Sequence, residues 1–356
     1  MPVIPGVAGT VPYSIFLIFI AYIISMRISM AVLIVNFSAL LFISAFLLIN
    51  DSRMLANYLL LLVGPNVFIY LYLAKTTPSI RSLRVFILSS FVLSIAFEFE
   101  LMTQMGRGVS GLYDEPSHFG RYLLTAILIF SLLNENITRV QIFYKYILPL
   151  FFINRSASTA VLFLIYFFAK IKLKDFYYWI FFGITAIVFY LYFNEFRFVK
   201  QFVIIFDLLQ SDNFLDRESI PSLLNQIGSR RLAQSFIAFL TPFYEFNGVN
   251  SVAIGGVSGF SEQIGMSLSQ ISWVEKQGLE NLKPGSYFSE LIFYFGFYGV
   301  LIIFLFLLFV IQRLRQKNCF PEVLVSLFML FFLSTTTFLA PWVLLGLSLQ
   351  KKTRLG

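Results

Sequence analysis

Apolar runs about as long as a membrane is thick recur along most of the chain, and this feature constrains the fold most strongly. A helix needs about 20 apolar residues to cross the hydrocarbon core of a bilayer. The runs predict spans at residues 11–26, 30–49, 54–74, 83–102, 118–133, 140–153, 156–169, 176–193, 287–311 and 320–349. We therefore expect an all-α, polytopic integral membrane protein.

The composition excludes several classes of protein and site. Only 12% of the residues are charged and 58% are hydrophobic, whereas soluble domains carry about a quarter charged residues. This excludes a cytosolic enzyme. A single Cys and a single His exclude an internal disulfide, a thiolate metal site and a multi-His metal site. Any chemistry must therefore use carboxylates, hydroxyls, guanidiniums and one imidazole.

The final run, 320–349, is too long for one comfortable span. Its STTT sequence at residues 334–337, followed by Pro341, predicts a turn. We therefore expect two short helices there, which brings the total to about eleven spans. Charge requires the same division, because one span fewer would leave the basic tail outside the cell.

Basic clusters follow alternate loops of this topology. They are Lys75, Arg81 and Arg84; Arg139; Lys170, Lys172 and Lys174; Arg313, Arg315 and Lys317; and Lys351, Lys352 and Arg354. The positive-inside rule places all of them in the cytoplasm, so we expect the N-terminus outside and the C-terminus inside. The net charge of +8 thus encodes orientation, and no nucleic-acid partner is expected.

Residues 1–356 are expected to form a single transmembrane domain, with one long hydrophilic loop at residues 195–285 on the outer side. A loop of this length calls for a functional explanation. Residues 198–210 predict a helix in the interface plane, and residues 229–243 place apolar side chains at helical spacing. The loop is therefore expected to be largely helical.

Three spans begin at the outer face with polar clusters, at residues 107–121, 154–159 and 284–290. Helix N-termini present free N–H groups and a positive dipole end, which suit anions such as phosphate. We expect these three ends to converge.

The first cluster places Glu115, His118 and Arg121 at i, i+3 spacing on one helix face. An acid, an imidazole and a guanidinium together can deprotonate a hydroxyl and hold an anion. The alternative is an ordinary interfacial helix start. In the second cluster, Arg155 either binds an anion or extends its side chain to lipid headgroups.

Arg230 and Arg231 fall in the first turn of the predicted helix at 229–243, where cations are disfavoured. An anionic partner would offset this cost, and Arg fits phosphate in a bidentate manner. Glu218 or Asp216 is the alternative partner.

Glu290 lies about one turn inside its span, where a carboxylate is costly unless it is paired or hydrated. Lys283 is a candidate structural partner. The chain has no Walker loop, no G-x-S-x-G elbow and no D-x-D pair for a metal-bound nucleotide sugar. These absences argue against nucleotide hydrolysis at a Walker loop, a G-x-S-x-G hydrolase and metal-dependent transfer from a nucleotide sugar.

Topology and motifs together resemble the bacterial O-antigen polymerase (Wzy-type) family, within the superfamily that also holds the O-antigen ligases. The resemblance covers nearly the whole chain. It is carried by Arg107 with Gly111, Glu115-Pro116-Ser117 with Gly120, Asn154-Arg155-Ser156, the long loop, Ser286-Tyr287, Glu290, Gly296 and Gly299.

The resemblance implies a GT-C-like, inverting glycosyltransferase that needs no metal or other cofactor. A sugar hydroxyl of one undecaprenyl-diphosphate-linked repeat would attack the anomeric carbon of a growing chain. The implied base is Glu115 or His118. Diphosphate binding is assigned to Arg107, Arg155, Arg230 and Arg231, with Arg121 beside them as a positioning residue, and supporting roles to Asp114, Ser286 and Glu290.

Two rival functions remain: an O-antigen ligase, which transfers the lipid-linked glycan to another acceptor, and a lipid-linked oligosaccharide flippase. Ligases of the superfamily commonly carry a His at the end of the long loop, where this chain has Pro284-Gly285-Ser286, which favours a polymerase. A lipid-linked oligosaccharide flippase would need charges near the midplane, whereas these lie at the outer face. We expect a bacterial inner membrane location, a periplasmic active site, membrane lipids and the undecaprenyl-linked oligosaccharide as partners, and, by resemblance, a chain-length regulator.

Overall fold

The computed structural model describes residues 37–38, 55–73, 78–105, 116–134, 137, 139–154, 156–170, 235, 239, 285–315, 319–334 and 338–350. All regular secondary structure in this part of the chain is helical, so the all-α expectation is confirmed for it. The predicted spans 11–26 and 176–193 lie outside the described residues, as do nearly all of 30–49 and of the long loop.

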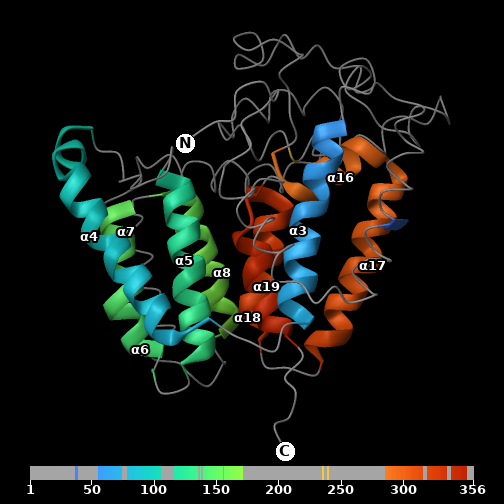
Figure 1. The fold of residues 1–356 in the computed structure, drawn as a ribbon. Helices are drawn as coiled ribbons and strands as arrows, with labels where there is room; N and C mark the ends of the chain where they lie inside the picture. Colours follow the sequence, from blue (N-terminus) through green and yellow to red (C-terminus); the bar gives the residue numbers. More distant parts are fainter. Residues whose placement is uncertain are drawn as a thin grey trace, which may run out of the picture. The chain divides into compact units, whose positions relative to one another are not determined.

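Most predicted spans in the described part coincide with helices (Figure 1). The first five are α3 (Leu55–Leu73), α4 (Ile80–Met105), α5 (Pro116–Leu133), the continuous segment α6 (Arg139–Ile142), η2 (Phe143–Ile147) and α7 (Leu148–Asn154), and α8 (Ala157–Lys170). Here η marks a π-helical segment. The later elements are α16 (Tyr287–Phe295), α17 (Phe297–Leu314), α18 (Phe320–Phe328), η5 (Met329–Leu333) and α19 (Ala340–Leu349).

The final apolar run forms two helical segments, as expected. α18 continues into η5, and α19 begins only at Ala340. Pro341 lies in the first turn of α19, where its missing N–H leaves no hydrogen bond unmade. α18 and α19 pack against each other. The predicted division of this run into two helical segments is confirmed, and residues 335–337, where the turn was predicted, lie outside the described residues.

The prediction of one continuous span at residues 287–311 is wrong, because Gly296 separates α16 from α17. This glycine has a φ of 55°, a backbone angle that residues other than glycine rarely adopt. A Cβ at Gly299 would lie 2.9 Å from the Ile292 Cα and nearer still to the Leu291 carbonyl. The backbones of the two helices thus approach more closely than a side chain allows.

The chain divides into two compact units. The first comprises Met1–Tyr166, Phe309–Met329 and Thr336–Gly356, and the second comprises Phe167–Leu308 and Leu330–Thr335. Within the first unit, α5 packs against α4, α7 and α19, and α19 also packs against α3 and α18. The apolar residues of α5 from Phe119 to Phe130 are buried, except for the half-buried Tyr122. α5 is therefore the central helix of the first unit.

Glycines allow α3 and α19 to approach closely. Gly64 of α3 faces the indole of Trp342, and a Cβ there would overlap the ring. A Cβ at Gly346 of α19 would lie 2.8 Å from the Leu71 Cβ and 3.1 Å from the Phe68 carbonyl oxygen. Small residues at helix contacts are characteristic of packing in membranes, where close backbone approach replaces a hydrophobic driving force.

Among the described residues, α17 alone is long and apolar enough to cross a membrane. Shorter apolar stretches occur at Leu60–Leu73, His118–Leu133, Ser158–Ala169, Phe320–Leu333 and Ala340–Leu349. A single such helix is weak evidence, because the core helix of a soluble protein can pass the same test. The membrane location and the orientation of the chain stay predictions.

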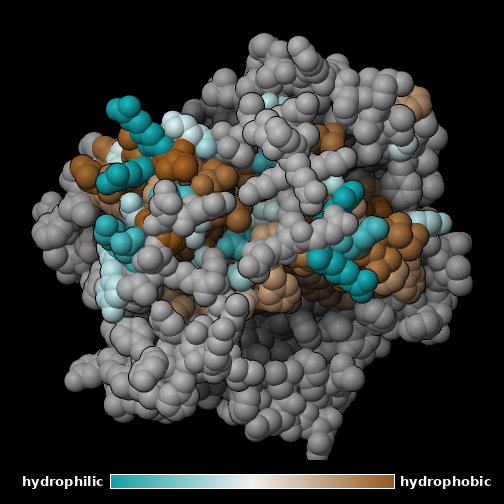
Figure 2. Space-filling view, turned by 90° about the horizontal axis from the view of Figure 1, so that it is seen from below, coloured by the Kyte–Doolittle hydropathy of each residue, from teal (hydrophilic) through white to brown (hydrophobic). Residues whose placement is uncertain are grey.

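The outward faces of two helices are unusually apolar. On α4 the exposed residues include Val85, Phe86, Leu88, Val92 and Leu93. On α17 they include Leu301, Ile302, Phe304, Leu305, Leu308 and Ile311. A helix at the surface of a soluble protein normally presents a polar face to water. Figure 2, which views the molecule from below, shows hydrophobic residues on its surface beside the hydrophilic ones.

Candidate functional site

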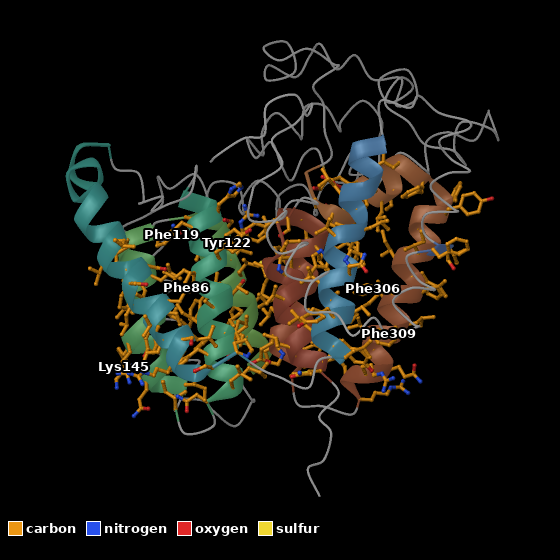
Figure 3. All side chains as sticks on the ribbon, in the orientation of Figure 1. Phe86, Phe119, Tyr122, Lys145, Phe306 and Phe309 are labelled. Atoms are coloured by element: carbon orange, nitrogen blue, oxygen red, sulfur yellow. The ribbon has the colours of Figure 1, made fainter. Side chains whose placement is uncertain are left out.

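One polar and aromatic cluster lies in the first two turns of α5. His118, Arg121 and Tyr122 share one face of the helix, and all three contact Phe338, which precedes α19. The ring centroids of His118 and Tyr122 lie 6.0 and 4.4 Å from that of Phe338. Figure 3 labels Tyr122 near the upper end of α5. We call these four residues the Phe338 cluster.

Arg121 supplies a deeply buried positive charge to this cluster. Only 1% of its surface is exposed, and its guanidinium carbon lies 4.5 Å from the centre of the Phe338 ring. A guanidinium over an aromatic face gains about 2 kcal/mol when both are desolvated. The stacked position holds the charge in one orientation and away from solvent. This burial favours a positioning role for Arg121.

A second contact joins α5 to the corner between α7 and α8. A Cβ at Gly120 would lie 2.7 Å from the Asn154 Cγ and would overlap the Thr159 hydroxyl. The Thr159 hydroxyl donates a hydrogen bond of 3.0 Å to the Asn154 side-chain oxygen, and both side chains are buried. Only glycine at position 120 permits this approach without rearrangement.

The contact at Gly120 brings together two of the three predicted motif segments. The start of α5 carries His118 and Arg121, and the α7–α8 corner carries Asn154 and Ser156, the residues on either side of Arg155. Ser156 shares a hydrogen bond of 2.9 Å with Ser158 at the start of α8. The expected convergence is confirmed for these two helix starts.

The third segment forms the start of α16 in the second unit. The Ser286 hydroxyl accepts a hydrogen bond of 3.3 Å from the Ser289 N–H, and the Ser289 hydroxyl accepts one of 3.0 Å from the Ser286 N–H. This reciprocal pair is a capping box. Ser286, predicted to support the site, thus has a structural task as the N-cap of α16. Convergence with the first two segments stays a prediction.

Glu290 lies in the first turn of α16 and is 8% exposed. A carboxylate near a helix N-terminus is stabilised by the free N–H groups and the positive dipole end. Tyr287, one turn earlier in the chain, donates its backbone N–H to the Ser334 carbonyl. This bond ties the start of α16 to the segment that follows η5. The candidate partner Lys283 lies outside the described residues.

Several predicted site residues fall outside the part of the chain that the structure describes. They are Arg107, Asp114, Glu115, Arg155, Arg230 and Arg231. Their roles stay predictions. Of the predicted residues that are described, His118 and Arg121 lie in one cluster of the first unit, and Ser286 and Glu290 lie in one turn of the second unit.

Sequence reasoning missed Phe338, Tyr122 and the pair formed by Asn154 and Thr159. With 45 Phe residues in the chain, no single Phe carries a signal of its own. Gly120 was part of a motif, but its neighbours could be found only from the folded chain. Asn154 also lay in a motif, and its position at a predicted helix start was the available signal.

The cluster at the start of α5 offers a defined set of chemical groups. The half-buried imidazole of His118 can accept a proton from a hydroxyl. The guanidinium of Arg121 keeps its charge when buried and stabilises nearby negative charge. Such a fixed cation acts most strongly where water is excluded. The arrangement suits proton abstraction from a hydroxyl close to an anion.

Comparison with known proteins found no sequence family that matches the chain, no curated protein that matches it and no solved structure that matches it. The resemblance drawn from topology and motifs therefore stays a prediction.

Proposed function

We propose that this protein is a glycosyltransferase of the bacterial inner membrane that joins undecaprenyl-diphosphate-linked oligosaccharide repeats at the periplasmic face. The observation that carries the proposal is the contact of Gly120 with Asn154 and Thr159. This contact gathers His118 and Arg121 beside the segment that contains Arg155. An imidazole and a guanidinium at the start of α5, next to the α7–α8 corner, are groups that such a transfer can use.

In the proposed reaction, a hydroxyl oxygen of the acceptor sugar attacks the anomeric carbon of the donor chain. The bond from that carbon to the diphosphate oxygen breaks, and undecaprenyl diphosphate leaves with the bonding electrons. Glu115 or His118 takes the hydroxyl proton. Attack from the side opposite the leaving group inverts the anomeric configuration.

Charge stabilisation is the main demand of this reaction, because diphosphate leaves as a stable anion and needs no general acid. Arg107, Arg155, Arg230 and Arg231 are proposed to bind the two diphosphates, since Arg forms bidentate hydrogen bonds with phosphate. Arg121 orients the site from its stacked position on Phe338. No metal or cofactor is part of this proposal.

The apolar outward faces of α4 and α17 support a membrane setting for the reaction. A lipid-linked substrate of this kind stays in the bilayer, and its diphosphate lies at the membrane surface. An enzyme that acts on it needs spanning helices with polar ends. The tightly packed start of α5 fits such a polar end.

The first experiment deletes the gene in its host and compares surface polysaccharide on gels. Loss of a polymerase leaves a single repeat on the lipid core. Loss of a ligase instead leaves polymer on undecaprenyl, and loss of a flippase strands single repeats on the cytoplasmic side. Either of the last two patterns contradicts the proposal.

The second experiment complements the deletion with Arg107→Ala, Arg155→Ala and Arg230→Ala. Removing one donor that stabilises developing charge costs about 10²–10³ in rate, so each variant should shorten the polymer or abolish it. Arg315→Ala is the matched control, because this arginine is exposed at the end of α17 and should leave polymer unchanged. Normal polymer length and yield in all three variants would falsify the assignment.

A further inference from the structure

Exposed basic side chains gather at one end of the first unit. Arg81 and Arg84 lie in the first turns of α4, and Lys145 lies in η2; all three are exposed. Figure 3 labels Lys145 beside the lower part of α4, and η2 leads directly into α7, which packs on α4. We call these three residues the basic rim.

The outward face of α4 continues from the basic rim as an apolar stripe. Val85, Leu88 and Val92 are 59%, 45% and 63% exposed. They follow Arg81 at i+4, i+7 and i+11, so they share its face of the helix. The opposite face carries Ile87 and Phe91, which are buried. The described side chains of α4 therefore present cations at the start of the outward face, followed by hydrocarbon at Val85, Leu88 and Val92.

Among the side chains that the structure describes in the first unit, no exposed carboxylate offsets the charge of the basic rim. Glu322 is the one acidic side chain that the structure describes there, and it is only 2% exposed. Tyr144, which is 55% exposed, lies next to Lys145. Tyrosine and basic residues are typical of the level of lipid headgroups.

We propose that the basic rim and the apolar stripe of α4 bind an anionic phospholipid. The phosphate contacts Arg81, Arg84 and Lys145, and the acyl chains lie along Val85, Leu88 and Val92. Arg binds phosphate oxygens in a bidentate manner, and the apolar stripe matches hydrocarbon. A nucleic acid or an acidic protein would match the cations but not the stripe. This site is separate from the proposed glycosyl transfer and does not depend on it.

The test uses the full-length protein, purified in detergent micelles and titrated with phosphatidylglycerol or phosphatidylcholine. Bound lipid is counted by native mass spectrometry. Each basic residue near an anionic surface strengthens binding about fivefold. The variant Arg81→Gln/Arg84→Gln/Lys145→Gln should therefore bind phosphatidylglycerol roughly 100-fold more weakly than the wild type, with little change for phosphatidylcholine.

Three further variants separate the parts of the proposal. Ser82→Ala, in the same exposed first turn, is the neutral control and should bind like the wild type. Arg81→Lys/Arg84→Lys keeps the charge and should retain most of the preference for phosphatidylglycerol. Val85→Ser/Leu88→Ser/Val92→Ser should weaken both lipids alike, because it removes the acyl contact.

Two results would overturn the proposal. One is equal affinity of the wild type for both lipids, and the other is undiminished binding of phosphatidylglycerol by the triple Gln variant. Thermal unfolding without added lipid checks that the variants fold. If the triple variant does not fold, Arg84→Gln alone carries the test, and an affinity loss well below fivefold then counts against the proposal.

Discussion

The central helix α5 and the outward faces of α4 and α17 have similar apolar sequences but opposite surroundings. α5 is buried along nearly its whole described length, whereas α4 and α17 expose Phe, Leu, Val and Ile side chains. Arginines differ in the same way. Arg121 of α5 is buried on Phe338, while Arg315 at the end of α17 is exposed.

This difference teaches that apolar composition does not tell a packed face from a free one. The buried helix depends on shape, because its side chains and its glycine fit particular neighbours. The outward faces need only apolar side chains and no particular shape. Substitutions in α5 and its neighbours should therefore cost stability, and matched substitutions on the outward faces should not.

The largest effect is expected for Phe338→Ala. Its ring contacts His118, Arg121 and Tyr122, and removing a buried Phe costs about 3–5 kcal/mol. Phe86→Ala on α4, which is 46% exposed and is labelled in Figure 3, should change stability by about 0.5 kcal/mol or less. Unfolding in mixed detergent micelles measures both. Equal losses would remove the distinction between the two faces.

Leu124→Ala is expected to come next. Leu124 is 1% exposed on α5, and truncating a buried Leu costs about 2–5 kcal/mol. Leu301→Ala makes the same truncation on the outward face of α17 and should stay within about 0.5 kcal/mol. The same unfolding titration compares them. A loss above 2 kcal/mol for Leu301→Ala would mean that this face is packed.

Gly120→Ala should cost about 1–3 kcal/mol, the usual range for overpacking. The added methyl would overlap the Thr159 hydroxyl and crowd Asn154, and both side chains are held by their mutual hydrogen bond. A double-mutant cycle with Thr159→Ala measures the coupling. The double variant should be more stable than the sum of the two single losses predicts. Strict additivity would argue against this contact.

Arg121→Met should have the smallest effect on stability and the clearest effect on function. Loss of the stack on Phe338 costs about 2 kcal/mol, and removing a buried charge offsets part of that cost. Polymer length on gels should nevertheless fall sharply, because the site loses its fixed cation. Arg315→Met should leave both readouts unchanged. Normal polymer in cells that carry Arg121→Met would argue against the positioning role.

Much of the described fold could be predicted from local patterns. Apolar runs located α3, α4, α5, α8 and the segment from α6 to α7, and the turn before Pro341 separated the last two helices. The break at Gly296 could not be predicted this way, because the apolar run continues through it. A positive φ at one glycine and the close approach at Gly299 depend on how the two helices pack.

The candidate site was predicted in part. Helix spacing alone placed His118 and Arg121 on one face, and the structure confirms that they share a cluster. The same spacing could not find Phe338, which reaches the cluster from a distant part of the chain. Ser286 was predicted to support the site, and its capping role in α16 depends on backbone geometry.

The sequence by itself determined that the described chain is helical and where most of its helices begin and end. Backbone hydrogen bonds and side-chain periodicity act over a few residues, so these features can be predicted locally. Only the tertiary structure decided that Arg121 is buried on Phe338 and that Gly120 meets Asn154 and Thr159. These contacts join residues far apart in the chain, and they form only when shape and volume match on folding.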